Sequence, residues 1–200
     1  MLELIVAGAA VLAVGGAVLA FRAGKRSVQA AERAVRAVEA RRGLDALRVN
    51  DIVQQGGRDW LVEGVVEYLE DGHAWRHARG SDVPDERWFV VGMERQGGLT
   101  VRVVAAVPGL TLAGYPPDAL THDGVDYKVV QRGTATLTLL GELGADLPAA
   151  TAQGSGARCR FFRYEADGGR TLLVEEWGER RRILGGTRLP AGDVELLGAG

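Results

Sequence analysis

The sequence predicts a mainly β protein in which an antiparallel β domain follows two N-terminal helices. Residues 2–21 form an apolar run in which Glu3 is the only charged side chain. Residues 22–42 carry seven Lys or Arg against two Glu, a net charge of +5, with apolar residues at helical spacing. Beyond residue 43, short alternating apolar runs are separated by many of the 29 glycines. We therefore expect a transmembrane helix over 1–21, a basic juxtamembrane helix or linker over 22–43, and a β domain over 44–198.

The apolar run has the length and the flanks of a membrane anchor. At about 1.5 Å per residue, twenty helical residues span about 30 Å, the thickness of the hydrocarbon core. A secretory signal would carry positive charge before the run, whereas here Glu3 precedes it and Arg22, Lys25 and Arg26 follow it. Because positive flanks stay in the cytoplasm, we expect a single-pass inner-membrane protein with its N-terminus outside and its C-terminal domain in the cytoplasm.

The sequence does not decide what the two N-terminal helices contact. Ala9, Ala13 and Ala17 recur at four-residue steps, a spacing that favours close packing with a second copy in lipid but is common in membrane helices. The basic helix either contacts anionic headgroups or is a solvated spacer, which could pair as a short parallel coiled coil. In the first case the membrane-surface residues are Arg22, Lys25, Arg26, Arg33, Arg36, Arg41 and Arg42.

Period-two alternation predicts the strands of the β domain. The segment "DWLVEGVVEYLEDG" places Trp60, Val62, Val66 and Tyr68 on one side and ends in an Asp-Gly turn. Further strands are expected in "RWFVVGMERQGGLTVRVV", "GTATLTLLGEL" and "CRFFRYEADGGRTLLVEEWGERRRIL", with turns at the glycine pairs. Residues 141–156 contain few large side chains in their second half and are expected to form a mobile loop.

A weak internal repeat suggests two lobes. "GRDWLVEG" at Gly57 resembles "GVDYKVVQRG" at Gly124, and later segments align at a larger offset. One explanation is duplication into SH3-like or meander lobes over about 44–115 and 120–198. The other is chance similarity among β-hairpins, and the sequence does not distinguish them.

Several segments of the β domain resemble a bacterial family, the domain of unknown function numbered 4178. The most specific are Val49–Val53, the strand at Trp60, and Glu176-Trp177-Gly178, within a resemblance covering about residues 44–197. Asn50 stands where that family usually has Gly, and both residues tolerate turns. The resemblance implies an accessory protein of envelope-associated gene clusters, some with phage-shock-like or polyamine-synthase-like neighbours, often with a membrane helix. It carries over no catalytic residue.

The sequence predicts no catalytic, cofactor or metal site. His73 and His77 share a face at their spacing, but a third ligand would have to be the distant His122 or Cys159. Ser155 lacks the Gly-x-Ser-x-Gly elbow, and no Gly-Lys-Ser/Thr follows the nearby glycines. The carboxylates Glu175, Glu176 and Glu179 stand beside Arg180, Arg181 and Arg182, which indicates a solvated, partly ion-paired hairpin end.

The charge of the β domain excludes one class of partner. Residues 43–200 carry 17 positive and 23 negative side chains, a net charge of −6. Nucleic-acid binding needs a concentrated basic surface, so we expect no nucleic-acid partner. The single cysteine, Cys159, cannot form an internal disulfide, in agreement with a reducing cytoplasm.

Two functions remain open from the sequence. The first is a non-enzymatic module at the inner face of the membrane that binds a protein partner, a further copy of itself or an unknown small ligand. The alternative is an enzyme whose active site is dispersed and leaves no local motif. For the module, Trp75 with His73, His77 and Tyr68 forms the expected recognition surface, since exposed aromatics are enriched at binding hot spots. Trp60 and Trp177 are expected in the core.

Overall fold

The structure is a computed structural model that describes residues 43–144, 147 and 156–199. The expected transmembrane helix over 1–21 and the basic helix over 22–43 lie outside these residues, apart from Gly43. In the part of the chain that is described, no helix is long and apolar enough to cross a membrane. Residues 42–200 form one compact unit.

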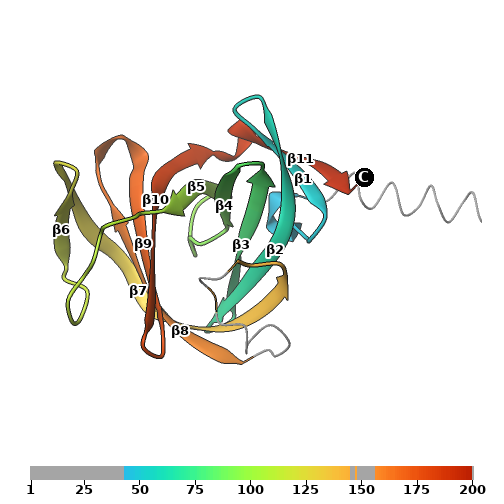
Figure 1. Cartoon of the computed structure of the whole chain (residues 1–200). Helices are drawn as coiled ribbons and strands as arrows, with labels where there is room; N and C mark the ends of the chain where they lie inside the picture. The colour runs from blue at the N-terminus through green and yellow to red at the C-terminus, as the bar shows by residue number, and fades with distance from the viewer. Residues whose placement is uncertain (1–42, 145–146, 148–155, 200) are drawn as a thin grey trace, which may run out of the picture. The chain divides into compact units, whose positions relative to one another are not determined.

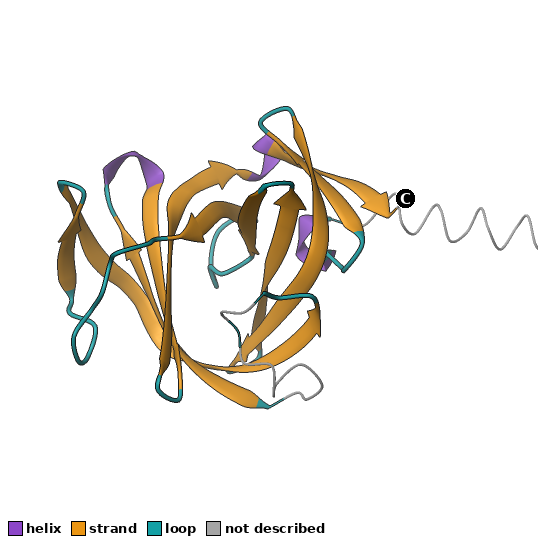
Figure 2. Cartoon of the chain, viewed as in Figure 1, coloured by secondary structure: helices purple, strands orange, loops and turns teal. Residues whose placement is uncertain are grey.

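The expected β domain is confirmed. Figure 2 shows that strands make up nearly all of it. The described residues also form three short 3-10 turns, η1 (Leu44–Ala46), η3 (Asp167–Gly169) and η4 (Ala191–Asp193). The described residues form eleven antiparallel strands (Figure 1): β1 (Asp51–Gln55), β2 (Arg58–Glu70), β3 (His73–Asp82), β4 (Asp85–Val91), β5 (Thr100–Ala106), β6 (Ala119–His122), β7 (Val125–Gly141), β8 (Ala157–Glu165), β9 (Arg170–Trp177), β10 (Arg180–Pro190) and β11 (Val194–Ala199).

Eight of these strands close into a barrel. The sheet order is β11-β1-β2-β3-β4-β5-β10-β9-β8-β7-β6, and β2 also pairs with β7 over Gly64–Leu69, which closes the ring. The long strands β2 and β7 each leave the barrel at one end, where β1 with β11 and β6 respectively extend the sheet. An eight-stranded barrel is just wide enough for side chains to fill its interior.

The two lobes expected from the sequence contribute to one barrel instead of forming two. Strands β1–β5 and β6–β10 are each a five-stranded meander, and the order of the second half mirrors that of the first. The halves meet at two seams, β2 with β7 and β5 with β10, and both seams are antiparallel. The repeated Gly-x-Asp-aromatic segments lie at the same place in each half, at the start of β2 and of β7.

Three apolar clusters hold the domain together. The largest fills the barrel and includes Trp75, Trp88, Phe161 and Trp177. A second cluster lies outside the barrel wall, between it and β1, β11 and η1, and a third lies on the outer face of β8, β9 and β10. The third is covered by the start of β7, by β6 and by the segment at 107–112. The barrel wall is therefore buried on both faces over much of its area.

Tight turns occur where the sequence offers residues that tolerate a positive φ. Asp71 and Gly72 have φ of 47° and 80°, which gives the predicted Asp-Gly turn between β2 and β3. In the predicted loop over 141–156, Leu143 and Leu147 are described, and both pack into the barrel core. Most of the rest of that loop lies outside the described residues.

Candidate functional site

Four polar side chains meet inside the barrel. The Tyr68 hydroxyl on β2 donates to Glu175 Oε1 on β9 at 2.6 Å, and Arg182 Nε on β10 donates to Glu175 Oε2 at 2.8 Å. His77 Nδ1 on β3 lies 3.2 Å from Glu175 Oε1, but it is not aligned for a hydrogen bond, so this contact is electrostatic. Tyr68, His77 and Glu175 each expose 1% of their surface and Arg182 exposes 5%.

Burial and the neighbouring charges set the ionisation of this interior network. Burial alone would raise the pKa of Glu175, but the Arg182 guanidinium beside it holds that pKa well below its ordinary value. Burial lowers the pKa of His77 despite the nearby Glu175 carboxylate. Burial, followed by the Glu175 charge, raises the pKa of Tyr68 well above its ordinary value. At neutral pH the network therefore holds one carboxylate, one guanidinium, a neutral imidazole and a neutral phenol.

Aromatic rings enclose the network. The Arg182 guanidinium carbon lies 4.2 Å from the ring centre of Trp88 and 5.5 Å from that of Trp177. Cys159 is fully buried in the same core, and burial raises the pKa of its thiol, which keeps it protonated and unreactive. Because all four groups are almost fully buried, we assign the network to the stability of the barrel.

The prediction that Trp75 and its neighbours form an exposed recognition surface is wrong. Trp75, Tyr68 and His77 are buried, and His73 is half-buried. The four do lie together, since Trp75 stacks on Tyr68 with ring centres 5.1 Å apart, Tyr68 contacts His77 at 4.2 Å, and His73 stacks on Trp75 at 5.7 Å. Because the inward positions of β2 and β3 alternate with outward ones, these rings fill the barrel. The expectation that Trp60 and Trp177 are core residues is confirmed, at 2% and 6% exposure.

The interpretation of the charged run at 175–182 as a solvated hairpin end is also wrong for three of its members. Glu175, Glu176 and Arg182 are buried. For Glu175 the sequence did contain a signal. It alternates with Leu173 and Trp177, which places its carboxylate on the same face of the strand as two large apolar side chains.

A second ion cluster faces the interior near the start of β5. Arg102 Nη2 donates to Glu165 Oε1 at 2.7 Å and also to Glu94, while Arg163 Nη1 donates to Glu94 and Glu165, each at 2.8 Å. Two guanidinium groups are thus balanced by two carboxylates. The formal charges of this cluster therefore sum to zero.

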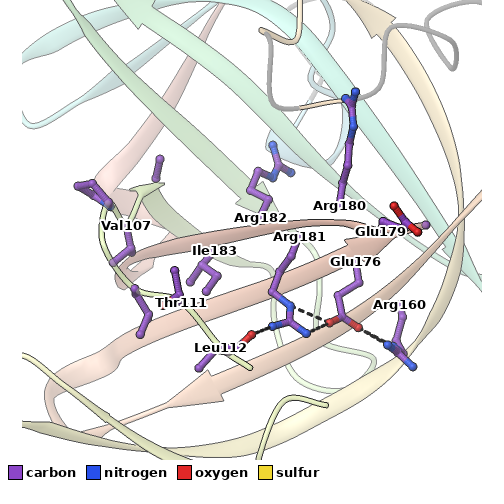
Figure 3. A pocket seen from close by; sticks show the side chains of 14 residues that line it. Val107, Thr111, Leu112, Arg160, Glu176, Glu179, Arg180, Arg181, Arg182 and Ile183 are labelled. Atoms are coloured by element: carbon purple, nitrogen blue, oxygen red, sulfur yellow. Dashed lines mark hydrogen bonds and ion pairs between the residues drawn. The ribbon is translucent and has the colours of Figure 1, made fainter. Parts of the chain in front are cut away.

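The outer face of the barrel carries a pocket of about 880 Å³ (Figure 3). One wall is the segment from Ala106 to Leu112, which follows β5 and contributes Val107, Pro108 and Leu110. The floor and the opposite side come from the β9–β10 hairpin and from Arg160 on β8. This pocket is the strongest candidate for a functional site, because it is open to solvent and combines apolar and charged side chains.

Linked ion pairs hold the side chains at the floor of the pocket, as the dashed lines in Figure 3 show. Arg160 Nε donates to Glu176 Oε2 at 2.6 Å, and Arg181 Nε donates to Glu176 Oε1 at 2.8 Å. The Arg181 guanidinium also donates to the carbonyl oxygens of Leu112 and Gly114. Arg181 therefore ties the wall to the hairpin, and all of its donor nitrogens are occupied.

Arg160 and Arg180 are the exposed arginines of the pocket that keep donors for a ligand. The Arg160 side chain is 51% exposed, and Glu176 takes its Nε and Nη2 but not its Nη1. Its guanidinium carbon lies 5.3 Å from the ring centre of Tyr115, which holds it in place. Arg180 is exposed at the rim and makes no ion pair with the described residues.

The titratable side chains that line the pocket are carboxylates and guanidinium groups. Among the described residues that line it there is no His, Cys, Ser or Lys. In the described part of the chain, no three His, Cys, Asp or Glu side chains are grouped to hold a metal ion, and His73 and His77 join no such group.

Comparison with protein-family models decides the family. The model "Domain of unknown function (DUF4178)" matches residues 48–191, well over half of the chain. The chain belongs to the DUF4178 family. The matched region begins just before β1 and ends at η4, so it covers the whole barrel, the interior network and the pocket. Neither the curated proteins nor the solved structures that were compared gave a match.

Proposed function

We propose that this DUF4178 protein is a binding module whose outer pocket takes an extended segment of another protein, with apolar side chains and at least one carboxylate. The observation that carries the proposal is the pocket of about 880 Å³ beside the β9–β10 hairpin. Ligand sites in proteins have volumes of about 300–1,000 Å³ and combine apolar walls with a few polar groups.

The walls and the rim of the pocket select different parts of such a ligand. Val107, Pro108, Leu110 and Ile183 offer apolar contact. Arg160 and Arg180 offer guanidinium donors, which favour carboxylates because the charged hydrogen bonds can be bidentate. Glu176 repels a ligand carboxylate less than its charge suggests, because two arginines already neutralise it.

Binding is better supported than catalysis. Glu175, His77 and Tyr68, whose pKa values are shifted, are buried inside the barrel. The groups that a ligand can reach in the pocket are arginines, carboxylates, the Thr111 hydroxyl and apolar side chains, and these can hold a ligand.

The module acts, in this proposal, from the inner face of the membrane. The support is the apolar run over 2–21 with positive charge only after it, and the +5 segment over 22–42. Its place as an accessory of an envelope-associated system follows from the family resemblance alone. An anchored module needs little affinity for a partner in the same membrane, because both are confined to a thin layer.

Peptide selection tests the proposal. The full chain in detergent micelles is used to select from a displayed library of random heptapeptides, and the selected peptides are measured by fluorescence anisotropy. We expect acidic, apolar sequences whose affinity falls about tenfold in Arg160→Gln, because a charge-assisted contact is lost.

The matched control is Arg158→Gln. Arg158 is an exposed arginine two residues away on the same strand and face, but it does not line the pocket. It should leave the affinity unchanged. A selection that yields no binder, or binders that lose the same affinity in both variants, would refute the pocket as the site.

A further inference from the structure

Strand β10 has an unpaired edge where β5 ends. Strand β5 pairs with β10 from Ala106 opposite Leu184 to Thr100 opposite Pro190. Strand β10 begins earlier, at Arg180, and its residues 180–183 pair with β9 on one side. On the other side, no described strand pairs with this stretch.

The backbone direction at this edge follows from one hydrogen bond. The Val107 N–H donates to the Ile183 carbonyl oxygen at 3.0 Å, so the polar backbone groups of Ile183 face the side of β5. Because N–H and C=O directions alternate along a strand, the N–H and C=O of Arg181 face the same side, while those of Arg180 and Arg182 face β9. Arg181 thus presents one donor and one acceptor at the open edge.

The pocket lies at this edge. Its lining includes the end of β5 and the residues that follow it, Ala106, Val107 and Pro108, together with the whole stretch 180–183 of β10. The wall segment leaves the line of β5 at the turn over residues 108–109, where a continued β5 would have paired with Arg181. An unpaired strand edge is a template for an added strand.

We propose that the partner segment binds by strand addition, pairing its backbone with β10 at Arg181 in line with β5. This inference rests on the proposed function, and it specifies how the same pocket holds its ligand. Side chains of an added strand alternate between two faces. On one face they lie beside Arg180, and on the other they lie beside Arg181, Ile183 and the apolar wall.

The charge of Arg180 then specifies the partner sequence. Arg180 is exposed and has no ion pair with the described residues, and an opposite charge directly across a strand pair is favourable. The partner therefore carries Asp or Glu opposite Arg180 and apolar residues at the neighbouring positions, in a pattern that alternates with a period of two.

Backbone methylation of a selected heptapeptide separates this mode from binding of any other kind. N-methyl groups are introduced one position at a time, and the affinity for the full chain in detergent micelles is measured. Strand addition predicts a loss of about tenfold or more at one position, whose N–H donates to the Arg181 carbonyl oxygen, and small effects at the two adjacent positions, whose N–H groups point away from β10. In amide hydrogen exchange, the Arg181 N–H should become protected on binding, whereas the Arg182 N–H is protected already.

Charge reversal supplies the matched variants. Arg180→Glu should weaken the acidic peptide and strengthen its lysine analogue, while Arg188→Glu, an exposed arginine where β10 is already paired with β5, should do neither. If no single position shows this loss and the Arg181 amide stays unprotected, strand addition is overturned while the pocket remains a binding site. If no peptide is selected at all, the proposed function itself fails.

Discussion

Replacing Glu175 by Gln tests whether the interior network holds the barrel together. Glu175 accepts hydrogen bonds from Tyr68 at 2.6 Å and from Arg182 at 2.8 Å, on three different strands of the wall. Gln keeps the size of the side chain but removes its charge, which leaves the buried Arg182 guanidinium without a counter-ion. Removing one partner of a buried ion pair costs about 3–5 kcal/mol. Domains of this size are stable by about 5–15 kcal/mol, so the variant should lose a large share of its stability.

Urea unfolding of the full chain in detergent micelles measures the loss through tryptophan fluorescence. All four tryptophans are buried, at 2%, 2%, 3% and 6% exposure, so unfolding changes the surroundings of every one. The matched control is Asp118→Asn, which removes a carboxylate 2.7 Å from Arg132 in a pair whose side chains are 74% and 48% exposed. Its midpoint should stay close to that of the parent, because water screens exposed pairs.

A double variant separates the ion pair from the packing around it. In Glu175→Gln with Arg182→Met no buried charge is left unpaired, and the Met side chain fills part of the space between Trp88 and Trp177. The double variant should be less destabilised than the sum of the two single variants. The reasoning is refuted if Glu175→Gln costs less than about 1 kcal/mol, or if the two single effects simply add.

The remaining predictions concern His77, the orientation of the chain and one barrel seam. Burial lowers the pKa of folded His77 below the unfolded value of about 6.5, so its stabilising effect is full above that pH and is lost as the pH falls below it. His77→Gln should therefore show a smaller drop in urea midpoint between about pH 7 and pH 5 than the parent, and an equal drop would count against this. With Cys159 replaced by Ala, a cysteine added after Gly200 should resist a membrane-impermeant thiol reagent in intact cells; labelling would reverse the topology. Gly186→Ala puts a Cβ 2.1 Å from the Val103 carbonyl oxygen and should cost about 1–3 kcal/mol, whereas Gly192→Ala, which meets nothing within 4 Å, should match the parent midpoint.

Local patterns predicted the strands and turns well. The alternation at Trp60–Tyr68 became β2, the threonine alternation at 134–138 became the second half of β7, and the Asp-Gly pair at 71–72 became a turn. Each of these patterns depends only on residues a few positions apart, so it can be recognised without knowing which strands pair.

Closure of the barrel could not be predicted in the same way. It depends on pairs that lie far apart in the chain, such as Gly64 with Gly141 and Ala106 with Leu184. At these seams the glycines permit close approach, because a Cβ on Gly64 would lie 2.4 Å from the Glu142 carbonyl oxygen. A glycine in a strand indicates that another backbone comes close, but it does not show which strand that is.

The error at Trp75 has the same origin. His73, Arg76 and His77 surround Trp75 in the sequence, which made the segment look polar and exposed. Arg76 does face outward, where it pairs with Glu67 at 2.7 Å, but His77 turns inward with Trp75. Whether an inward histidine is tolerated depends on its partner, and Glu175 is almost a hundred residues away in the chain.

The run "EEWGERRR" shows how one short segment supplies both the core and the pocket. Its tight turn, with Gly178 at a φ of 63°, sets Glu175 opposite Arg182 and Glu176 opposite Arg181. The two ion pairs are chemically alike, so the turn does not decide which of them faces inward. The rest of the barrel decides which pair faces inward. Inside, Tyr68 and His77 contact the Glu175 carboxylate, and outside, the carbonyl oxygens of Leu112 and Gly114 accept hydrogen bonds from the Arg181 guanidinium. A slip of one residue would exchange the pairs and also expel Trp177 from the core. The interior network therefore does more than stabilise the barrel: by fixing which face of β10 points outward, it sets the position of Arg181 and with it the wall of the binding pocket.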